Sequence, residues 1–258
     1  MPLLRTAHGK PFTTPPWGYP VPTRHLLPST GTDRCGEDRA LSVIELLVDN
    51  RDLFLTGFRN TILLFLLAGI GALVVGTLLA AMRVSPVPVL RLLGGGYVNI
   101  FRNTPLTLVF FFFAFAYPRL DLLDVSFFTR AVLALIVYTA AFVCEVVRSG
   151  INTVDVGQAE ASRALGLTFT QTLTTIVVPQ AIRSVVPPLT SVLNALLKNT
   201  TVAAGFAVAE AGQITPTLSE RGASVLIGMV WIAIGFLILV IPLTATQRTL
   251  EKRWSVAR

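Results

Sequence analysis

A few ionisable side chains stand inside or beside the long apolar stretches of this 258-residue chain. Glu145 and Arg148 lie three residues apart in one stretch, and Lys198 lies within another. Charged groups at membrane depth are costly, so they indicate either a solute pathway or a polar lock between helices. The lock is the simpler interpretation for Glu145 and Arg148. For Lys198, attraction of an acidic solute and anchoring of a helix interface stay equally open. The candidate pathway or helix-interface residues are Arg102, Glu145, Arg148, Lys198, Asn199 and Thr200.

Nothing in the sequence indicates covalent chemistry. There is no G-x-x-x-x-G-K-[ST] phosphate loop, and no cluster of metal ligands or nucleophiles. The two cysteines, Cys35 and Cys144, have a spacing that suggests neither a disulfide framework nor a zinc site. We therefore expect no catalytic residue, no bound metal and no cofactor in this chain.

The composition is that of a membrane protein. Hydrophobic residues make up 53% of the chain and charged residues 14%, and the mean hydropathy is +0.68, whereas a soluble domain has about 25% charged residues. The net charge of +7 is spread over loops and helix ends. Such a distribution is typical of the positive flanks of membrane helices and argues against a nucleic-acid partner.

Five apolar segments predict an all-α integral membrane protein with about five transmembrane helices. Each approaches the roughly 20 residues that span a bilayer, and none alternates with the period of two of a barrel strand. Pro187 and Pro188 predict a kink or a late start in the fourth segment. The segments are Thr61 to Met82, Pro105 to Tyr117 with its extension back through residues 94–104, Ala131 to Val147, Ser184 to Val208, and Ala223 to Thr246.

The second segment is the least regular. Its uncharged part is short, so it reaches spanning length only if Arg102 snorkels to the interface. Thr104 and Pro105 resemble a helix N-cap and a first-turn proline. They predict an interfacial helix joined to a membrane helix.

Residues 1–42 differ from the rest, because they hold seven prolines, scattered charges and no apolar period. We predict a disordered extension rather than a signal peptide, with the membrane domain in residues 43–258. The true start of the protein is hypothesised to lie near Val43. A peptide from Met1 to Arg39 in N-terminal mass spectrometry of the native protein would contradict this.

Lysine and arginine residues concentrate in alternate loops, which predicts an outer N-terminus and a cytoplasmic C-terminus in the cell membrane. The basic residues of 1–42 fit an outer location poorly. On this topology the stretch "GQAEASRALGLTFTQTLTTIVVP", Gly157 to Pro179, is cytoplasmic.

This stretch predicts a helix, a turn and a second helix. Gly166 suits a left-handed helix end, Thr168 or Thr170 can cap the second helix, and that helix must stop or kink at Pro179. Glu160 and Arg163 can hold the first helix in shape. The small residues Ala161 and Ala164, with Leu165, form a narrow face that fits a groove on another protein. A connector that merely covers the bilayer surface is an equally open alternative.

The spacing E-A-S-x3-G-x9-I-x-V-P closely resembles the E-A-A-x3-G-x9-I-x-L-P loop of the permease subunits of ABC transporters. The departures, Ser162 and Val178, are mild. The resemblance implies that the loop is the coupling helix, which sits in a cleft of a cytoplasmic ATPase subunit. The ATPase-coupling residues would then be Gly157, Glu160, Ala161, Ser162, Arg163, Gly166, Ile176 and Pro179.

Other motifs resemble the polar amino-acid permeases of the histidine, glutamine and glutamate uptake type. They are "YVNIFRNTPLTLV", "EVVRSGINTVDVGQAEASRALG" and "LLKNTTVA". Asn103 stands where that family usually has Gly, and Asn199 where it has Asp. Within the family the motifs look most like the permeases of actinobacterial glutamate importers.

The resemblance covers about Thr56 to Trp254 and implies a type I ABC importer permease that forms half of a translocation pathway. It implies two cytoplasmic ATPase subunits that hydrolyse ATP, a second permease subunit, identical or homologous, and an extracytoplasmic solute-binding protein. A gradient-driven secondary transporter or a channel is the alternative, but such folds usually show internal repeats or broken helices. A membrane scaffold would need no coupling loop.

Overall fold

The computed structural model describes residues 37–121 and 123–254, which form helices joined by short turns, with no strand among them. The chain divides into two units, Met1–Arg39 and Ala40–Arg258, and every contact given below lies within the second. Most of the predicted extension, residues 1–36, lies outside the described residues. Helix α1 (Glu37–Asp49) begins ahead of Val43, so the predicted boundary at residue 42 falls inside a helix.

Four helical stretches are long and apolar enough to cross a membrane. Each overlaps one predicted apolar segment and extends past at least one end of it, because polar residues at a helix end reach the interface while the backbone hydrogen bonds continue. They are α2 (Arg51–Val84), α5 (Phe127–Ile151), the run Phe169–Phe206 that contains α8 (Val178–Asn199), and α10 (Val225–Trp254). The shorter elements on either side of α8 are α6 (Val156–Ala164), α7 (Phe169–Thr172), η3 (Leu173–Val177), η4 (Thr200–Phe206), η5 (Ala211–Gln213) and α9 (Ile214–Glu220).

The second predicted segment is a bent pair of helices. Helix α3 (Pro88–Asn103) and the run Leu106–Leu120 meet at 105°, and if the pair counts as one span the number of spans is five. Pro105 lies at the bend, where its ring keeps the residue before it in an extended conformation. The second run consists of α4 (Leu106–Phe111), η1 (Phe112–Ala116) and η2 (Tyr117–Leu120).

The predicted capping at this bend is wrong. Thr104 is the C-cap of α3 rather than the N-cap of the next helix, and its hydroxyl donates to the carbonyl oxygen of Ile100 at 2.8 Å. Pro105 occupies the N-cap position of α4 and offers no side-chain bond. A threonine hydroxyl can donate to a carbonyl oxygen of the preceding helix or accept from a backbone N–H of the following helix. Here it donates to a carbonyl oxygen in the last turn of α3.

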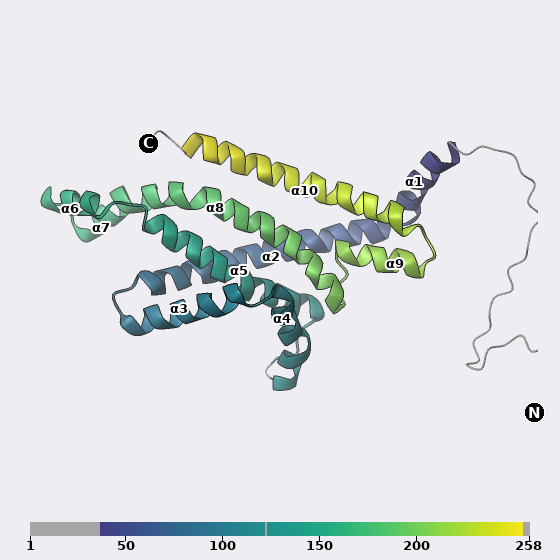
Figure 1. Ribbon diagram of the computed structural model, residues 1–258, viewed down its shortest axis with the longest axis horizontal. Helices are drawn as coiled ribbons and strands as arrows, with labels where there is room; N and C mark the ends of the chain where they lie inside the picture. Colours follow the sequence, from purple (N-terminus) through teal and green to yellow (C-terminus); the bar gives the residue numbers. More distant parts are fainter. Residues whose placement is uncertain (1–36, 122, 255–258) are drawn as a thin grey trace, which may run out of the picture. The chain divides into compact units, whose positions relative to one another are not determined.

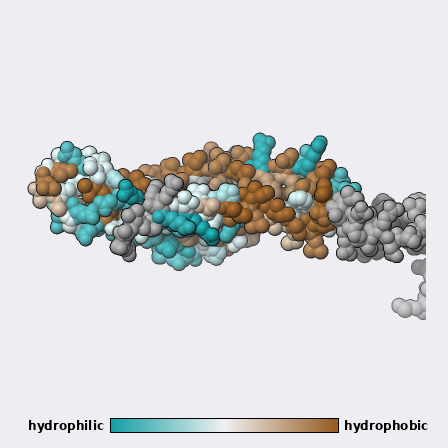
Figure 2. Space-filling model, turned by 90° about the horizontal axis from the view of Figure 1, so that it is seen from above, coloured by the Kyte–Doolittle hydropathy of each residue, from teal (hydrophilic) through white to brown (hydrophobic). Residues whose placement is uncertain are grey.

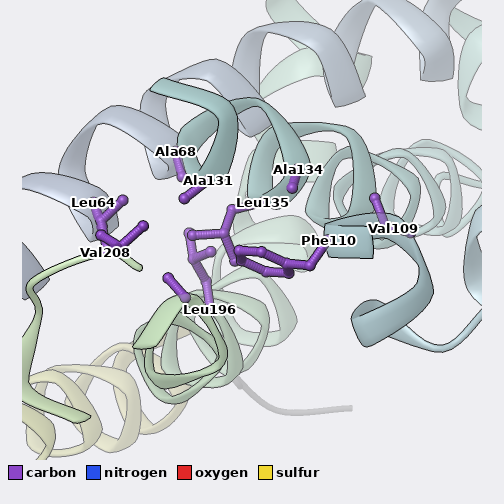
Figure 3. Close-up of a cluster of buried hydrophobic side chains, with 10 residues drawn as sticks. Leu64, Ala68, Val109, Phe110, Ala131, Ala134, Leu135, Leu196 and Val208 are labelled. Atoms are coloured by element: carbon purple, nitrogen blue, oxygen red, sulfur yellow. The ribbon is translucent and has the colours of Figure 1, made fainter. Parts of the chain in front are cut away.

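The core forms where α2, α5 and α8 pack side by side (Figure 1). The contact between α2 and α5 uses small residues, which let the two backbones approach closely. At Gly76, an added Cβ would lie 2.6 Å from Cβ of Val143 and 2.8 Å from the carbonyl oxygen of Ala140. Figure 3 shows the largest buried cluster, in which Phe110 and Leu135 lie above Leu196. The cluster consists of Leu64, Ala68, Val109, Phe110, Ala131, Ala134, Leu135, Leu196, Ala203 and Val208.

Helix α10 lies along α8 (Figure 1), and polar side chains join the two helices. The Gln247 amide donates to Ser191 Oγ at 2.8 Å and accepts from Asn194 Nδ2 at 3.1 Å. Pro187 and Pro188 both lie inside α8, which begins at Val178, so the predicted late start of this helix is wrong.

Large apolar side chains remain exposed along the long helices, among them Ile70 at 62% and Leu226 at 77%. Figure 2 shows apolar residues over the middle of the long helices and hydrophilic residues gathered at the end that carries α6 and α7. In water such a surface would be an aggregation liability. In a bilayer it is the surface that meets the lipid chains.

Candidate functional site

The predicted helix, turn and helix after α5 are present. Helix α6 is N-capped by Asp155, whose Oδ1 accepts from the Gly157 N–H at 2.8 Å. Gly166 has φ of +86°, the left-handed conformation predicted for it, and its N–H donates to the carbonyl oxygen of Arg163. Thr168 caps α7 in a reciprocal capping box with Gln171. Local sequence therefore shapes this loop.

Ser162 ties the two short helices together. It is only 5% exposed, its hydroxyl donates to the carbonyl oxygen of Ala159 at 2.8 Å, and its Oγ lies within hydrogen-bond distance of Thr172 Oγ1, at 3.0 Å. A second bond joins Gln180 Nε2 to Gln158 Oε1 at 2.6 Å. Ser162 thus lies inside the loop and shapes it, although the sequence placed it among the contact residues.

The outward side of the loop is small and apolar. Ala161 and Ala164 are exposed, as the predicted narrow face requires, and Leu165 is 82% exposed. Phe169, which the sequence analysis did not single out, is 74% exposed at the start of α7. The sequence could have predicted this exposure, because an aromatic side chain directly after an N-cap threonine cannot pack back onto its own short helix.

One expectation for this loop is wrong, because Glu160 and Arg163 are both exposed and form no ion pair within the part of the chain that the structure describes. Of the predicted stop or kink at Pro179, the stop is absent. The π-helical turn η3 carries α7 into α8, and Pro179 falls in the first turn of α8, where a missing N–H is tolerated. Ile176 lies within this continuous run.

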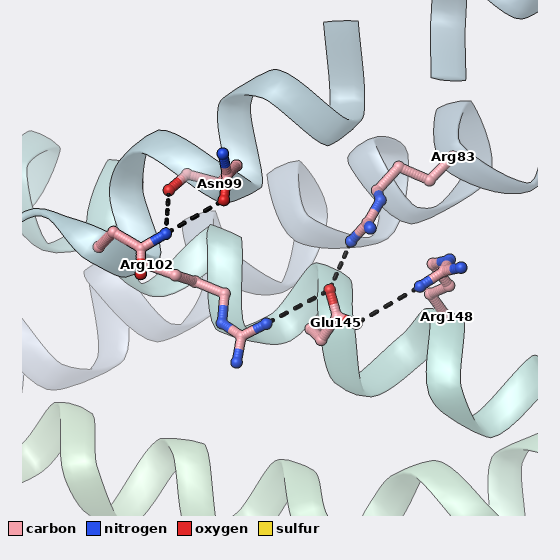
Figure 4. A network of polar contacts seen from close by, with 6 residues as sticks. Arg83, Asn99, Arg102, Glu145 and Arg148 are labelled. Atoms are coloured by element: carbon pink, nitrogen blue, oxygen red, sulfur yellow. Dashed lines mark hydrogen bonds and ion pairs between the residues drawn. The ribbon is translucent and has the colours of Figure 1, made fainter. Parts of the chain in front are cut away.

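Glu145 joins three helices. Its carboxylate accepts from Arg83 of α2 at 2.5 Å, and lies 3.6 Å from Arg102 of α3 and 3.4 Å from Arg148 of its own helix α5 (Figure 4). The predicted polar lock between helices is thus present, with Arg83 as a partner that the sequence analysis missed. Arg83 stands in the last turn of α2, sixty-two residues before Glu145, so no local spacing relates the two.

Arg102 does not simply snorkel to the interface. Its guanidinium carbon lies 5.8 Å from the ring centroid of Phe142, as in a cation–π contact. In the same helix, Asn103 Nδ2 donates to Asn99 Oδ1 at 3.1 Å. These groups line a cavity of about 350 Å³, called here the charged cavity, whose walls are Arg83, Gly95, Val98, Asn99, Arg102, Asn103, Phe142 and Glu145.

The remaining candidates lie at the far end of α8 and do not join this cluster. Lys198 is exposed in the last turn, where its charge suits the negative end of the helix dipole. Thr200 is buried, and its hydroxyl donates to the carbonyl oxygen of Leu197 at 2.7 Å. Asn199 is half-buried and lines a different cavity.

A buried carboxyl that the sequence analysis did not consider follows η4. Glu210 is 1% exposed and accepts hydrogen bonds from the Gly212 N–H at 2.7 Å and from the Thr61 hydroxyl at 3.1 Å. Burial raises the pKa of Glu210 to about 7, against the opposing effect of these bonds. The carboxyl fastens the segment before α9 to helix α2.

Long apolar helices around a small-residue core, with a two-helix polar loop at one end, are features expected of a membrane transport permease. The chain belongs to the family described as the binding-protein-dependent transport system inner membrane component, which it matches over residues 72–256.

Individual relatives agree with this assignment. The chain is 44% identical to the glutamate transport system permease protein GluC of Corynebacterium glutamicum, covering 79% of this chain and 95% of the relative. It is 35% identical to the probable glutamine ABC transporter permease protein GlnM of Bacillus subtilis, covering 81% and 97%. A solved amino acid ABC transporter with histidines superposes with a TM-score of 0.74 at 25% identity, covering 80% and 96%.

Proposed function

We propose that this chain is the permease subunit of an ATP-driven importer of glutamate, in which the loop around Gly166 couples ATP use to transport. The observation that carries the proposal is the geometry of that loop. Its capped helices and its left-handed Gly166 form a defined projection from which the apolar side chains of Leu165 and Phe169 stand exposed. Such a projection suits insertion into a cleft of another protein. The similarity to glutamate and glutamine permeases supports the cargo.

The partners follow from the same proposal. Two cytoplasmic ATPase subunits hydrolyse ATP, a second permease completes the pathway, and an extracytoplasmic protein delivers the amino acid. This chain itself binds no cofactor and performs no covalent chemistry. It is a multi-pass protein of the cell membrane, in contact with lipid, with its N-terminus outside and its C-terminus in the cytoplasm. The placement of lysine and arginine residues supports this orientation.

The mechanism is alternating access. ATP binding brings the two ATPase subunits together, their clefts carry the coupling loops along, and the membrane helices open outward to accept cargo. In this chain the helical run Phe169–Phe206 leads from the loop through η3 into α8 without a flexible linker. Since α8 packs on both α5 and α10, a displacement of the loop reaches the core of the bundle directly.

The test is Gly166→Pro in proteoliposomes that hold this chain with its partner permease and ATPase. Proline cannot adopt φ of +86° and lacks the N–H that bonds Arg163. We expect ATP-dependent uptake of radiolabelled glutamate to fall to background while the second permease still co-purifies.

The matched control is Gly222→Pro at the end of α9. Gly222 also has a positive φ, of +69°, an open surrounding, and an N–H that donates to a carbonyl three residues back. The Gly222→Pro substitution disturbs the backbone in the same way but lies outside the coupling loop, so ATP-dependent glutamate uptake should persist. Equal loss in both variants, equal retention in both, or uptake without ATP would contradict the proposal.

A further inference from the structure

Residues 207–213, called here the return segment, join the end of η4 to α9 and lie against helix α2. Asn60 Nδ2 of α2 donates to the carbonyl oxygen of Ala209 at 2.7 Å. One turn earlier in α2, Gly57 permits a close approach, because an added Cβ there would lie 3.3 Å from Cα of Ala211. The return segment is thus docked on one face of α2 by contacts between residues that are distant in the sequence.

The carboxyl of Glu210 lies within this docked surface. Its Oε1 accepts from the Gly212 N–H at 2.7 Å, and its Oε2 lies 3.1 Å from Thr61 Oγ1 of α2. Both Glu210 and Thr61 are buried. The side chain therefore links the backbone of the return segment to α2 and is shielded from water.

The hydrogen bonds around Thr61 Oγ1 favour a neutral Glu210. This oxygen accepts from the Ala211 N–H at 3.0 Å, and it lies 3.0 Å from the carbonyl oxygen of Gly57 and 3.1 Å from Glu210 Oε2. The threonine hydroxyl has a single proton and cannot donate to both acceptors. A protonated Glu210 removes the conflict, because its Oε2 then donates to Thr61 while the Thr61 hydroxyl donates to Gly57.

A charge on Glu210 would have no counter-ion. The elements that pack around η5 are α1, α2, η4 and α9. None of their charged side chains forms an ion pair with Glu210 within the described part of the chain. Burial therefore raises the pKa of Glu210 to about 7. The charged residues described on these elements and their caps are Glu45, Asp49, Arg51, Asp52, Arg59, Arg83, Glu220 and Arg221.

Loss of the Glu210 proton makes the docked arrangement unfavourable. The carboxylate would lie buried without a counter-ion, and it gains hydration by moving to the surface. Ala207, at the start of the return segment, has φ of +59°, a left-handed conformation that is unfavourable for a residue with a Cβ. Release of the return segment relieves this strain as well. Ionisation of Glu210 therefore favours release.

We propose that Glu210 is a pH switch, in which the neutral carboxyl holds the return segment on α2 and loss of the proton releases it. The segment follows the helical run Phe169–Phe206, so the switch fixes or frees the end of the run that leads from the coupling loop. The switch itself assumes no cargo and no coupling role. With the proposed orientation the return segment lies on the outer side, so the pH outside the cell operates the switch, and this consequence alone rests on the proposed function.

The test is amide hydrogen exchange in the return segment of the detergent-solubilised full-length protein. Its readout is the exchange rate of the wild type relative to Glu210→Gln at the same pH, which cancels the intrinsic pH dependence of exchange. The glutamine amide donates to Thr61 as the neutral carboxyl does, but it does not titrate. If release returns the pKa of Glu210 from about 7 to its ordinary 4.5, the relative rate should rise roughly thirtyfold from about pH 5.5 to about pH 8.5. Glu220→Gln, an exposed carboxyl on α9, is the control and should exchange like the wild type.

A second pair of variants tests the hydroxyl that receives the return segment. Thr61 and Thr190 both donate to a carbonyl oxygen four residues back, but only Thr61 also bonds the return segment. At about pH 5.5, Thr61→Val should therefore exchange roughly tenfold faster than the wild type in that segment, and Thr190→Val should match the wild type.

A relative rate that stays constant between the two pH values, or equal exchange in Thr61→Val and Thr190→Val, would overturn the inference. Neither measurement involves transport. Either result therefore leaves the coupling proposal to the comparison of Gly166→Pro with Gly222→Pro.

Discussion

Single carboxylate side chains in this chain link segments that are far apart in the sequence. Glu145 of α5 holds arginines from α2 and α3 as well as one from its own helix. Glu210 fastens the segment after η4 to α2 through Thr61. In each case a carboxylate satisfies donors that would otherwise lie unpaired in an apolar setting, which is costly. These polar residues of the membrane domain thus serve to position its helices.

Glu210 makes stability depend on pH. Its pKa rises from 4.5 to about 7 on folding, so between these values the folded protein holds a proton that the unfolded chain has lost. The stability that Glu210 contributes is therefore greatest below about pH 4.5 and is lost as pH rises through 7, by on the order of 3 kcal/mol. Thermal unfolding of the detergent-solubilised protein at about pH 5 and pH 8 measures this loss.

In that measurement Glu210→Gln should remove most of the dependence, because an amide keeps the hydrogen bonds without titrating in this range. Glu220→Gln changes an exposed carboxyl on nearby α9 and should unfold like the wild type. A pH dependence that survives Glu210→Gln unchanged would show that another group is responsible.

At the scale of helices, close backbone approach decides the packing. Helices α2 and α5 meet through glycine and alanine, and α8 then closes the core over Leu135 and Phe110 (Figure 3). Between apolar helices in lipid, tight van der Waals contact replaces the hydrophobic effect as the driving force. Small residues at the α2–α5 contact are therefore a requirement of assembly.

Gly76→Val tests this contact. The added side chain would overlap Val143 and the carbonyl oxygen of Ala140, and a backbone atom cannot move aside without separating the helices. We expect a loss of about 1–3 kcal/mol or more, seen as a lower melting temperature and poor recovery after purification. Gly96→Ala in α3, where an added Cβ meets nothing within 4 Å, is the control and should be neutral or slightly stabilising. Equal stability of the two variants would contradict the argument.

At the scale of the whole molecule, the polar loop and the lipid-facing surface set the orientation in the membrane. The loop of α6 and α7 lies at one end of the long helices, beyond the apolar surface (Figure 2). The proposed topology, drawn from the positive-inside rule, puts this end in the cytoplasm, where an ATPase could reach it. The turn that holds Leu123 then faces outward.

Accessibility of single cysteines tests that orientation. In a Cys35→Ser background the remaining native Cys144 is buried. Leu165→Cys and Leu123→Cys replace side chains that are 82% and 69% exposed. A membrane-impermeant maleimide added to intact cells should label Leu123→Cys and spare Leu165→Cys until the membrane is opened. The reverse pattern would invert the topology and remove the loop from reach of any cytoplasmic ATPase.

The sequence by itself determined the features that depend on neighbouring residues. Apolar runs of spanning length must become helices in a bilayer, because no water is present to satisfy their backbone, and Gly166 must end α6 because it alone there lacks a Cβ. Tertiary structure decided the rest. The continuity of the helix through Pro179, the partnership of Arg83 with Glu145 and the burial of Glu210 all depend on which helix faces which. Contacts between residues far apart in the sequence cannot be inferred from local patterns, because they form only when the helices pack together.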